Sequence, residues 1–220
     1  MKTRALFATA GITLLGIAMP AQSQTTLTAR LAHDQETTQG VPITATGAPR
    51  PLSFGTATFV LNSAMTEMTF TATIFNIDVT GTQTADPNDN LVAAHIHAPA
   101  PPGSNAGVVW GFFGAPDNDI NPDNLVVTPF ASDVGGTFSS IWNLPEGNSG
   151  TTLTAQIPNI LAGLSYMNFH TVQFGGGEIR GQIIPVPELS TWTMMLLGFG
   201  AVGTAVRRRK QKGLPFHEPA

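Results

Sequence analysis

The sequence predicts an all-β domain, an immunoglobulin-like or Greek-key β-sandwich or barrel of about eight or nine short strands. Short segments alternate apolar and polar side chains with period two, which is typical of strands with one buried face. Gly- and Pro-rich stretches separate these segments. Thr, Gly, Pro and Asn are abundant, and they favour strands and turns over helices. Hydrophobic targeting helices are expected to flank this domain at both ends.

The clearest alternation lies in Met68–Ile74, where four apolar side chains share one face and three threonines share the other. A short helical turn is expected only at Pro158–Gly163. The Gly175–Gly177 run is expected to form a tight hairpin, because no helix or lysine of a phosphate site follows it. Eight further strands are expected at Thr25–Leu31, Thr56–Leu61, Leu91–His97, Val108–Phe113, Thr137–Trp142, Thr151–Ile157, Ser165–Thr171 and Glu178–Ile183.

Composition excludes several classes of site. The chain has 220 residues and no cysteine, so it has no disulfide framework, thiolate metal site or cysteine nucleophile. Residues 24–187 hold three basic and 12 acidic side chains, a net charge of −9. This region should repel nucleic acid and anionic lipid, and it suits cations better than phosphate.

Residues 1–23 have the three parts of a secretory signal peptide. Lys2 and Arg4 are basic, an apolar run follows, and small residues end the segment near Ser23. We therefore expect signal peptidase to remove this segment during export across the inner membrane.

A second targeting segment is expected at residues 186–210. Val186, Pro187 and Glu188 precede an uncharged segment, about 191–206, that we expect to span the membrane. A basic cluster follows directly and is typical of a stop-transfer sequence with its basic end in the cytoplasm: Arg207, Arg208, Arg209 and Lys210.

This tail resembles the PEP-CTERM sorting signal of Gram-negative bacteria, with Leu189 where that motif has a second proline. The resemblance implies transient anchoring in the inner membrane, processing by an exosortase-type enzyme, and release to the cell surface or the extracellular matrix. A short polar tail, 211–220, follows the basic cluster. A plain membrane anchor is the alternative.

Three ordered motifs lie in the domain, at Ala93–Ala100, Leu161–Thr171 and Gly176–Ile183. Together they resemble the CHRD domain, named for chordin and found in secreted bacterial proteins, over most of Thr26–Ile184. The resemblance implies an immunoglobulin-like β-fold over residues 24–185 and an extracellular setting. It implies no biochemical activity.

Three histidines are candidate metal ligands. His95 and His97 are two residues apart on an expected strand, so they share a face, and His170 lies on another expected strand. If the strands are neighbours, His95, His97 and His170 converge and could hold zinc or copper. A His-x-His pair also occurs in copper-zinc superoxide dismutases, but His33 is the only other histidine of the domain, so no dismutase activity is expected. A hydrogen-bonded structural cluster is the alternative.

Acidic side chains offer a second candidate cation site. Asp117, Asp119 and Asp123 lie in an Asp/Asn-rich segment and provide the oxygen ligands that calcium takes. The segment does not match an EF-hand loop, and Asp and Asn also favour turns. Glu178 and Arg180 share a strand face and are expected to be structural partners within the sheet.

We expect no enzyme, because no catalytic constellation is recognisable. The leading hypothesis is an exported surface or matrix protein whose β-domain binds surface proteins or extracellular polysaccharide. The first alternative is a secreted zinc- or copper-binding protein that uses the three histidines. The second is a carbohydrate-binding module, in which Trp110 and Trp142 would stack on sugars, although core packing explains both tryptophans as well.

Overall fold

The computed structural model describes residues 24–37, 40–120, 125–187 and 189–211. The expected signal peptide, residues 1–23, lies outside the described residues, as do Glu188 of the expected sorting motif and nearly all of the polar tail. Nine strands make up the domain: β1 (Thr25–Ala32), β2 (Phe54–Leu61), β3 (Glu67–Phe75), β4 (Leu91–His97), β5 (Val108–Phe113), β6 (Val126–Pro129), β7 (Gly135–Asn143), β8 (Ser165–Thr171) and β9 (Ile179–Pro185).

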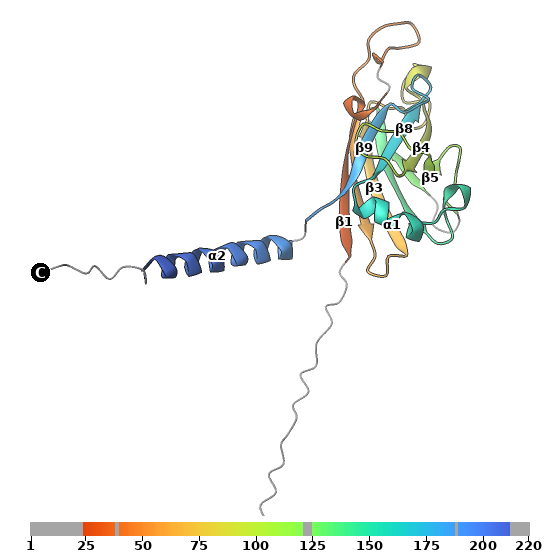
Figure 1. The fold of residues 1–220 in the computed structure, drawn as a ribbon. Coiled ribbons are helices and arrows are strands. Elements are labelled where there is room, and N and C mark those ends of the chain that lie inside the picture. Colours follow the sequence, from red (N-terminus) through yellow and green to blue (C-terminus); the bar gives the residue numbers. More distant parts are fainter. Residues whose placement is uncertain (1–23, 38–39, 121–124, 188, 212–220) are drawn as a thin grey trace, which may run out of the picture.

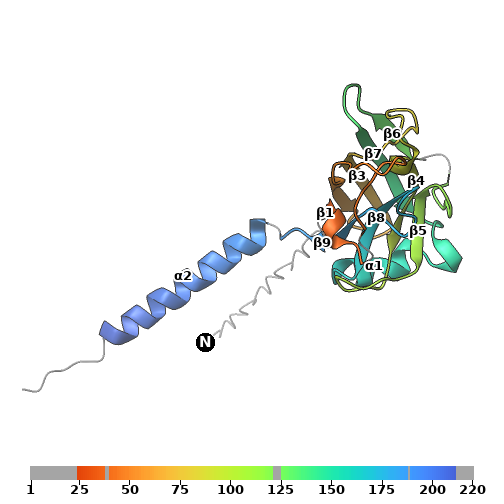
Figure 2. The same ribbon diagram turned by 90° about the horizontal axis from the view of Figure 1, so that it is seen from above.

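All nine strands belong to one antiparallel sheet in the order β5-β4-β8-β9-β1-β2-β3-β7-β6. The prediction of an all-β domain of about nine strands is confirmed. The strands form one continuous sheet rather than two separate ones. This sheet curls into a half-barrel, so that its two halves face each other across the core (Figures 1 and 2).

Aromatic contacts across the interior show how far the sheet curls. Trp110 of β5 stacks on Trp142 of β7, with ring centroids 5.4 Å apart, although these strands lie near opposite ends of the strand order. Both indoles are fully buried. The hypothesis that Trp110 and Trp142 stack on sugars is therefore wrong, because their large apolar rings stabilise the core instead.

The alternation in the sequence sets which face is buried. Met68, Phe70, Ala72 and Ile74 of β3 all face the core, as predicted, and the threonines between them face outward. The same inward alternation continues in β4 and β8, where Ile96, Met167 and Phe169 are buried in the core. Their neighbours along the two strands, His95 and His97 in β4 and Asn168 in β8, therefore point to the outer face of the sheet.

One expected strand is a helix. Residues 151–157 alternate like a strand, but the chain forms helix α1 (Leu153–Leu161), which begins after Thr152. The Thr152 hydroxyl accepts a hydrogen bond from the backbone N–H of Ala155 (3.4 Å), as an N-cap does. Leu153, Ile157 and Ile160 have helical spacing and pack into the core.

Helix α2 (Leu189–Gln211) follows β9 and covers the segment 191–206 (Figure 1). No helix among the described residues is both long enough and apolar enough to cross a membrane. The membrane-spanning role expected of segment 191–206 remains a prediction. Three short 3-10 helices complete the described structure: η1 (His33–Gln35), η2 (Pro87–Asp89) and η3 (Asn148–Gly150).

Candidate metal centre

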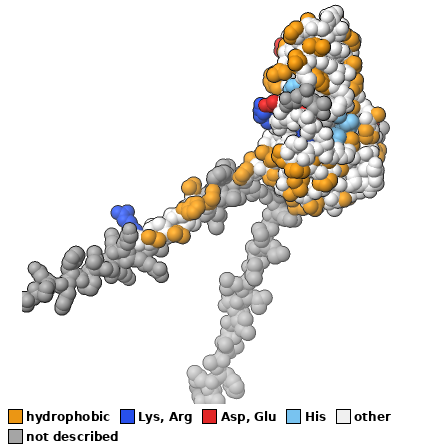
Figure 3. Space-filling model, turned by 45° about the horizontal axis from the view of Figure 1, so that its top comes forward, with side chains coloured by type: hydrophobic (Ala, Val, Ile, Leu, Met, Phe, Trp, Pro, Cys, Tyr) orange, Lys and Arg blue, Asp and Glu red, His pale blue; other side chains and the backbone are white. Residues whose placement is uncertain are grey.

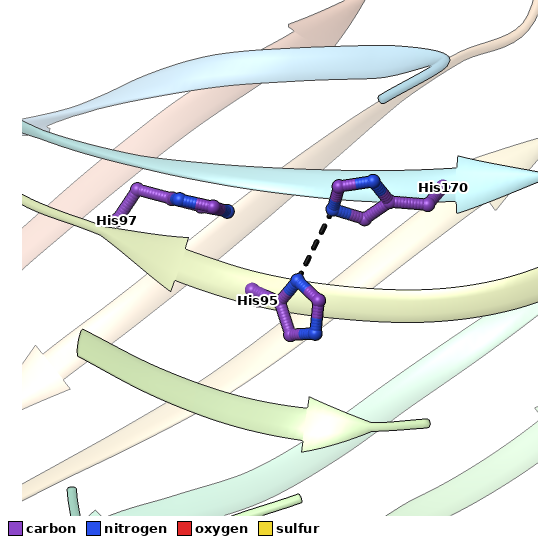
Figure 4. Close-up of side chains that lie close together, drawn as sticks. All are labelled: His95, His97 and His170. Carbon is purple, nitrogen blue, oxygen red and sulfur yellow. Dashed lines mark hydrogen bonds between the residues drawn. The ribbon is translucent and has the colours of Figure 1, made fainter. Parts of the chain in front are cut away.

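The three histidines meet on the outer face of the sheet, where β4 and β8 pair in antiparallel register. His95 lies opposite Asn168, and His97 lies opposite Tyr166. His170 follows two residues after Asn168 and points to the same face. The predicted convergence of the three imidazoles is thus present in the structure (Figure 4).

Each imidazole presents one ring nitrogen to a backbone carbonyl of a covering loop. His97 Nδ1 lies 2.9 Å from the carbonyl oxygen of Ala106, and His95 Nε2 lies 3.2 Å from that of Ala115. His170 Nδ1 lies 3.0 Å from the carbonyl oxygen of Gly175. The three side chains are only 5–8% exposed, and histidine atoms just reach the surface of the domain (Figure 3).

The other ring nitrogens point toward one another. His95 Nδ1 lies 3.1 Å from His170 Nε2. The side-chain oxygen Oδ1 of Asn168 lies 3.0 Å from both His97 Nε2 and His170 Nε2. The potential ligand atoms of the three histidines lie within 4.8 Å of one another.

The orientation of the Asn168 amide is set from its other side. Glu36 accepts a hydrogen bond from the Asn168 side chain, and a carboxylate can accept only from the amide nitrogen Nδ2. Oδ1 faces the imidazoles, and Nδ2 lies on the Glu36 side. Burial raises the pKa of Glu36, and Arg180 and this hydrogen bond oppose that shift.

The imidazoles are short of protons for these contacts. Five of their six ring nitrogens face oxygen acceptors. Three face backbone carbonyl oxygens, and two face the same atom, Asn168 Oδ1. Three neutral imidazoles carry only three N–H groups. If these three N–H groups are donated to the three carbonyls, the inward nitrogens, His95 Nδ1, His97 Nε2 and His170 Nε2, carry only lone pairs. No hydrogen then lies between these nitrogens, or between them and the Asn168 oxygen.

Protonation does not readily supply the missing donors. Burial, helped by the neighbouring His170 and His97, lowers the pKa of His95 to about 4. Burial likewise lowers the pKa of His97 and His170, against the effect of the carbonyls of Ala106 and Gly175. The imidazoles are therefore neutral near pH 7, the form that binds metal ions.

Tyr166 and Arg180 hold the covering segment 98–107 in place. His97 stacks on the Tyr166 ring with centroids 4.7 Å apart, and the Arg180 guanidinium lies 3.4 Å from the centroid of that ring. Arg180 also donates to the carbonyl oxygen of Ser104 (2.6 Å) and to Asn105 Oδ1 (3.1 Å). This buried arginine fixes the loop that carries the Ala106 carbonyl.

Glu178 lies in a separate buried network. Its carboxylate accepts two hydrogen bonds from Arg50, at 2.7 and 2.8 Å, one from Thr171 at 2.6 Å and one from Ser53. Both Glu178 and Arg180 are thus buried and bonded, but they bind different partners.

The expected calcium ligands are described only in part. Asp117 accepts a hydrogen bond from the backbone N–H of Asp119 (3.2 Å), and Asp119 accepts one from Ser140 (2.6 Å). Asp123 lies outside the described residues. In the described part of the chain, the three histidines are the only cluster of three or more His, Asp or Glu placed to hold a metal ion. Calcium binding therefore remains a prediction.

The expected sorting residues are described only in part. Val186 continues the pairing of β9, since its N–H donates to the Thr26 carbonyl (2.9 Å), and Pro187 follows it. The basic cluster Arg207, Arg208, Arg209 and Lys210 falls near the end of α2. A role of these residues in sorting remains a prediction.

Sequence reasoning missed Asn168 and Glu36 as members of the site. Asn168 has a recognisable signal, because it precedes His170 by two residues and so shares its strand face. Glu36 lies far away in the sequence, just after η1, and has no such signal.

Comparison with known proteins supports the family expected from the motifs. The sequence profile of the CHRD domain matches residues 27–183, which include all nine strands in whole or in part. No curated protein and no solved structure matches the chain. The chain therefore belongs to the CHRD domain family.

Proposed function

We propose that this CHRD-domain protein is an exported, non-catalytic β-protein that binds one transition-metal ion through His95, His97 and His170. The proposal rests on one observation: five ring nitrogens of the cluster face oxygen acceptors, but three neutral imidazoles have only three N–H groups to donate. A cation among the inward nitrogens needs no N–H on that side, so all three N–H groups can be donated to the carbonyls of Ala106, Ala115 and Gly175. Metal-bound histidines characteristically donate their other ring N–H in this way.

The donor set favours zinc or copper. Imidazole nitrogen suits zinc, copper, iron and nickel, whereas calcium and magnesium prefer oxygen ligands. The chain has no cysteine that could supply a softer thiolate ligand. Among the imidazole-binding divalent metals, copper binds most tightly, and zinc takes four ligands in a tetrahedron.

A broader binding role accompanies this site in the proposal. Family membership supports a non-enzymatic domain that acts outside the cell, where it would contact surface proteins or extracellular polysaccharide. The net charge of −9 over residues 24–187 disfavours nucleic acid as a partner. Sugar stacking on the two core tryptophans is no longer part of this proposal.

Metal analysis tests the binding site directly. The protein is purified without a histidine tag, incubated with zinc, passed through a desalting column and analysed by elemental mass spectrometry. We expect about one zinc ion per chain, and His97→Ala should lose it. His33→Ala is the matched control, because His33 is equally buried but lies outside the cluster. Equal metal content in wild type and His97→Ala would end the proposal.

Export is the second part of the proposal, and it rests on the sequence of the two ends. We propose that signal peptidase removes residues 1–23 and that an exosortase-type enzyme recognises the Val186–Glu188 motif. Intact-mass measurement of protein recovered from the native host tests both steps. A mature C-terminus that still carries Arg207–Lys210 would contradict processing of the tail.

A further inference from the structure

We infer that Asn168 Oδ1 is the fourth ligand of the metal ion, which makes the site closed and structural. This inference rests on the proposed function and extends it. Structural zinc sites have four protein ligands, whereas catalytic sites leave a position for water or substrate. The question is therefore whether the protein itself supplies a fourth donor atom at the right place.

The spacing of the donor atoms fits a four-coordinate ion. Bonds of about 2.0–2.1 Å in a tetrahedron place neighbouring donors about 3.3 Å apart. Asn168 Oδ1 lies 3.0 Å from His97 Nε2 and from His170 Nε2, and His170 Nε2 lies 3.1 Å from His95 Nδ1. The three histidine nitrogens lie within 4.8 Å of one another, so a bound ion would draw the more widely spaced nitrogens together.

Asn168 is held in the orientation that a ligand needs. The Glu36 carboxylate binds its amide nitrogen, so the lone pairs of Oδ1 point at the imidazoles. Gly177 permits this close packing. A Cβ atom there would collide with the Glu36 carboxylate and lie 2.8 Å from Asn168 Nδ2. Glu36 is thus a positioning residue that acts through Asn168.

A closed site at this position would fasten three loops to the sheet. The ring N–H groups opposite the ion bind the carbonyls of Ala106, Ala115 and Gly175, each in a different connection between strands. The chain has no cysteine, so no disulfide holds these loops. We infer that the ion takes over this structural role.

Cobalt(II) spectroscopy tests whether the site is closed. Cobalt(II) replaces zinc in tetrahedral sites, and its visible absorption is much stronger in four-coordinate than in six-coordinate geometry. The wild-type cobalt protein should show the strong spectrum, and added azide should leave it unchanged. In Asn168→Ala, the vacated position should admit water or azide, so azide should change the spectrum. Asn168→Asp keeps an oxygen ligand and should resist azide like wild type.

Zinc affinity provides the second readout. Asn168→Ala should weaken zinc binding about tenfold or more, because a ligand is lost. Asn168→Asp should lose less, because it keeps an oxygen ligand although it loses the hydrogen bond to Glu36. Glu36→Gln should weaken it about 10- to 100-fold, the usual effect of losing a group that orients a ligand. Circular dichroism establishes that each variant is folded. The azide titration of the wild-type cobalt protein tests the closed site even if a variant does not fold.

The outcomes separate this inference from the proposed function. Wild type that binds cobalt and responds to azide would overturn the closed site and leave metal binding intact. An Asn168→Ala variant with wild-type zinc affinity would likewise exclude Asn168 as a ligand. Wild type that binds neither zinc nor cobalt would overturn both.

Discussion

At the scale of single residues, His33 is an instructive comparison with the cluster. Its two ring nitrogens lie 2.8 and 2.9 Å from the carbonyl oxygens of Glu178 and Gly40, so a neutral ring is one proton short there as well. To give every oxygen-facing nitrogen of the cluster a proton, His97 and His170 would both need an added proton. Their ring centroids lie 6.3 Å apart, so the two charges would repel each other. A shared metal ion avoids this repulsion.

The buried ion pair between Arg50 and Glu178 gives a stability prediction. Its side chains are 5% and 0% exposed. Arg50→Ala should destabilise the domain by about 3–5 kcal/mol, because it leaves a buried carboxylate without its counter-ion. Chemical unfolding of Arg50→Ala, Glu178→Leu and Arg50→Met/Glu178→Leu measures this. The double variant should lose less free energy of unfolding than Arg50→Ala, because it leaves no buried charge unpaired. A loss below about 1 kcal/mol in Arg50→Ala would contradict this, because it is typical of exposed ion pairs.

Asp78 gives a prediction about pH. Its carboxylate is fully buried and accepts hydrogen bonds from the backbone N–H groups of Thr80 (2.9 Å), Gly81 (2.7 Å) and Thr84 (2.9 Å). Burial raises the pKa of Asp78, but these donors outweigh it and hold the pKa below its ordinary value of 3.8. The stabilisation is thus complete above about pH 4 and is lost as the pH falls through the lower folded-state value.

Asp78→Asn should therefore cost about 1.5–3 kcal/mol at pH 7, the range for hydrogen bonds to a charged group. The difference from wild type should shrink toward pH 2.5, because protonation of Asp78 removes the charge that these donors stabilise. Urea unfolding at the two pH values measures both quantities. The same difference at both pH values would show that the charge of Asp78 contributes nothing.

At the scale of elements, period-two alternation predicted eight of the strands, because each has one face on the core. It failed at α1, where Leu153 and Ile157 fit both a strand and a helix, and only the Thr152 cap and packing in three dimensions decide. Strand β6 was missed because its four residues are largely exposed and carry no alternation. The histidine convergence was predictable from two strand faces, whereas Glu36 depends on a loop path that no local pattern encodes.

Hydrogen exchange tests the loops as elements. If the ion fastens them, zinc should slow exchange in segments 98–107 and 113–118, where the Ala106 and Ala115 carbonyls bind His97 and His95. Strands β1, β2 and β3 lie away from the cluster in the sheet order and should change little. Mass spectrometry of zinc-loaded and chelator-treated protein measures this. If zinc-loaded and chelator-treated protein exchanged at the same rate in the two loop segments, the ion would not stabilise these loops.

At the scale of the whole molecule, a domain without disulfides depends on its core and on any ion that it binds. Zinc at about 100 times its dissociation constant should add about 2.7 kcal/mol to the free energy of unfolding. For a domain of this size, that corresponds to a rise in Tm of about 5–10 °C. Calorimetry should show this rise in wild type and its loss with a chelator, and His97→Ala should show no rise. A zinc-independent Tm in wild type would contradict the expected stabilisation.

The most direct test of the central claim is a crystal structure of the zinc-loaded protein, with diffraction measured on both sides of the zinc absorption edge. The claim predicts one anomalous peak about 2.0–2.1 Å from His95 Nδ1, His97 Nε2 and His170 Nε2. Zinc bound elsewhere, with no peak among these three nitrogens, would contradict it.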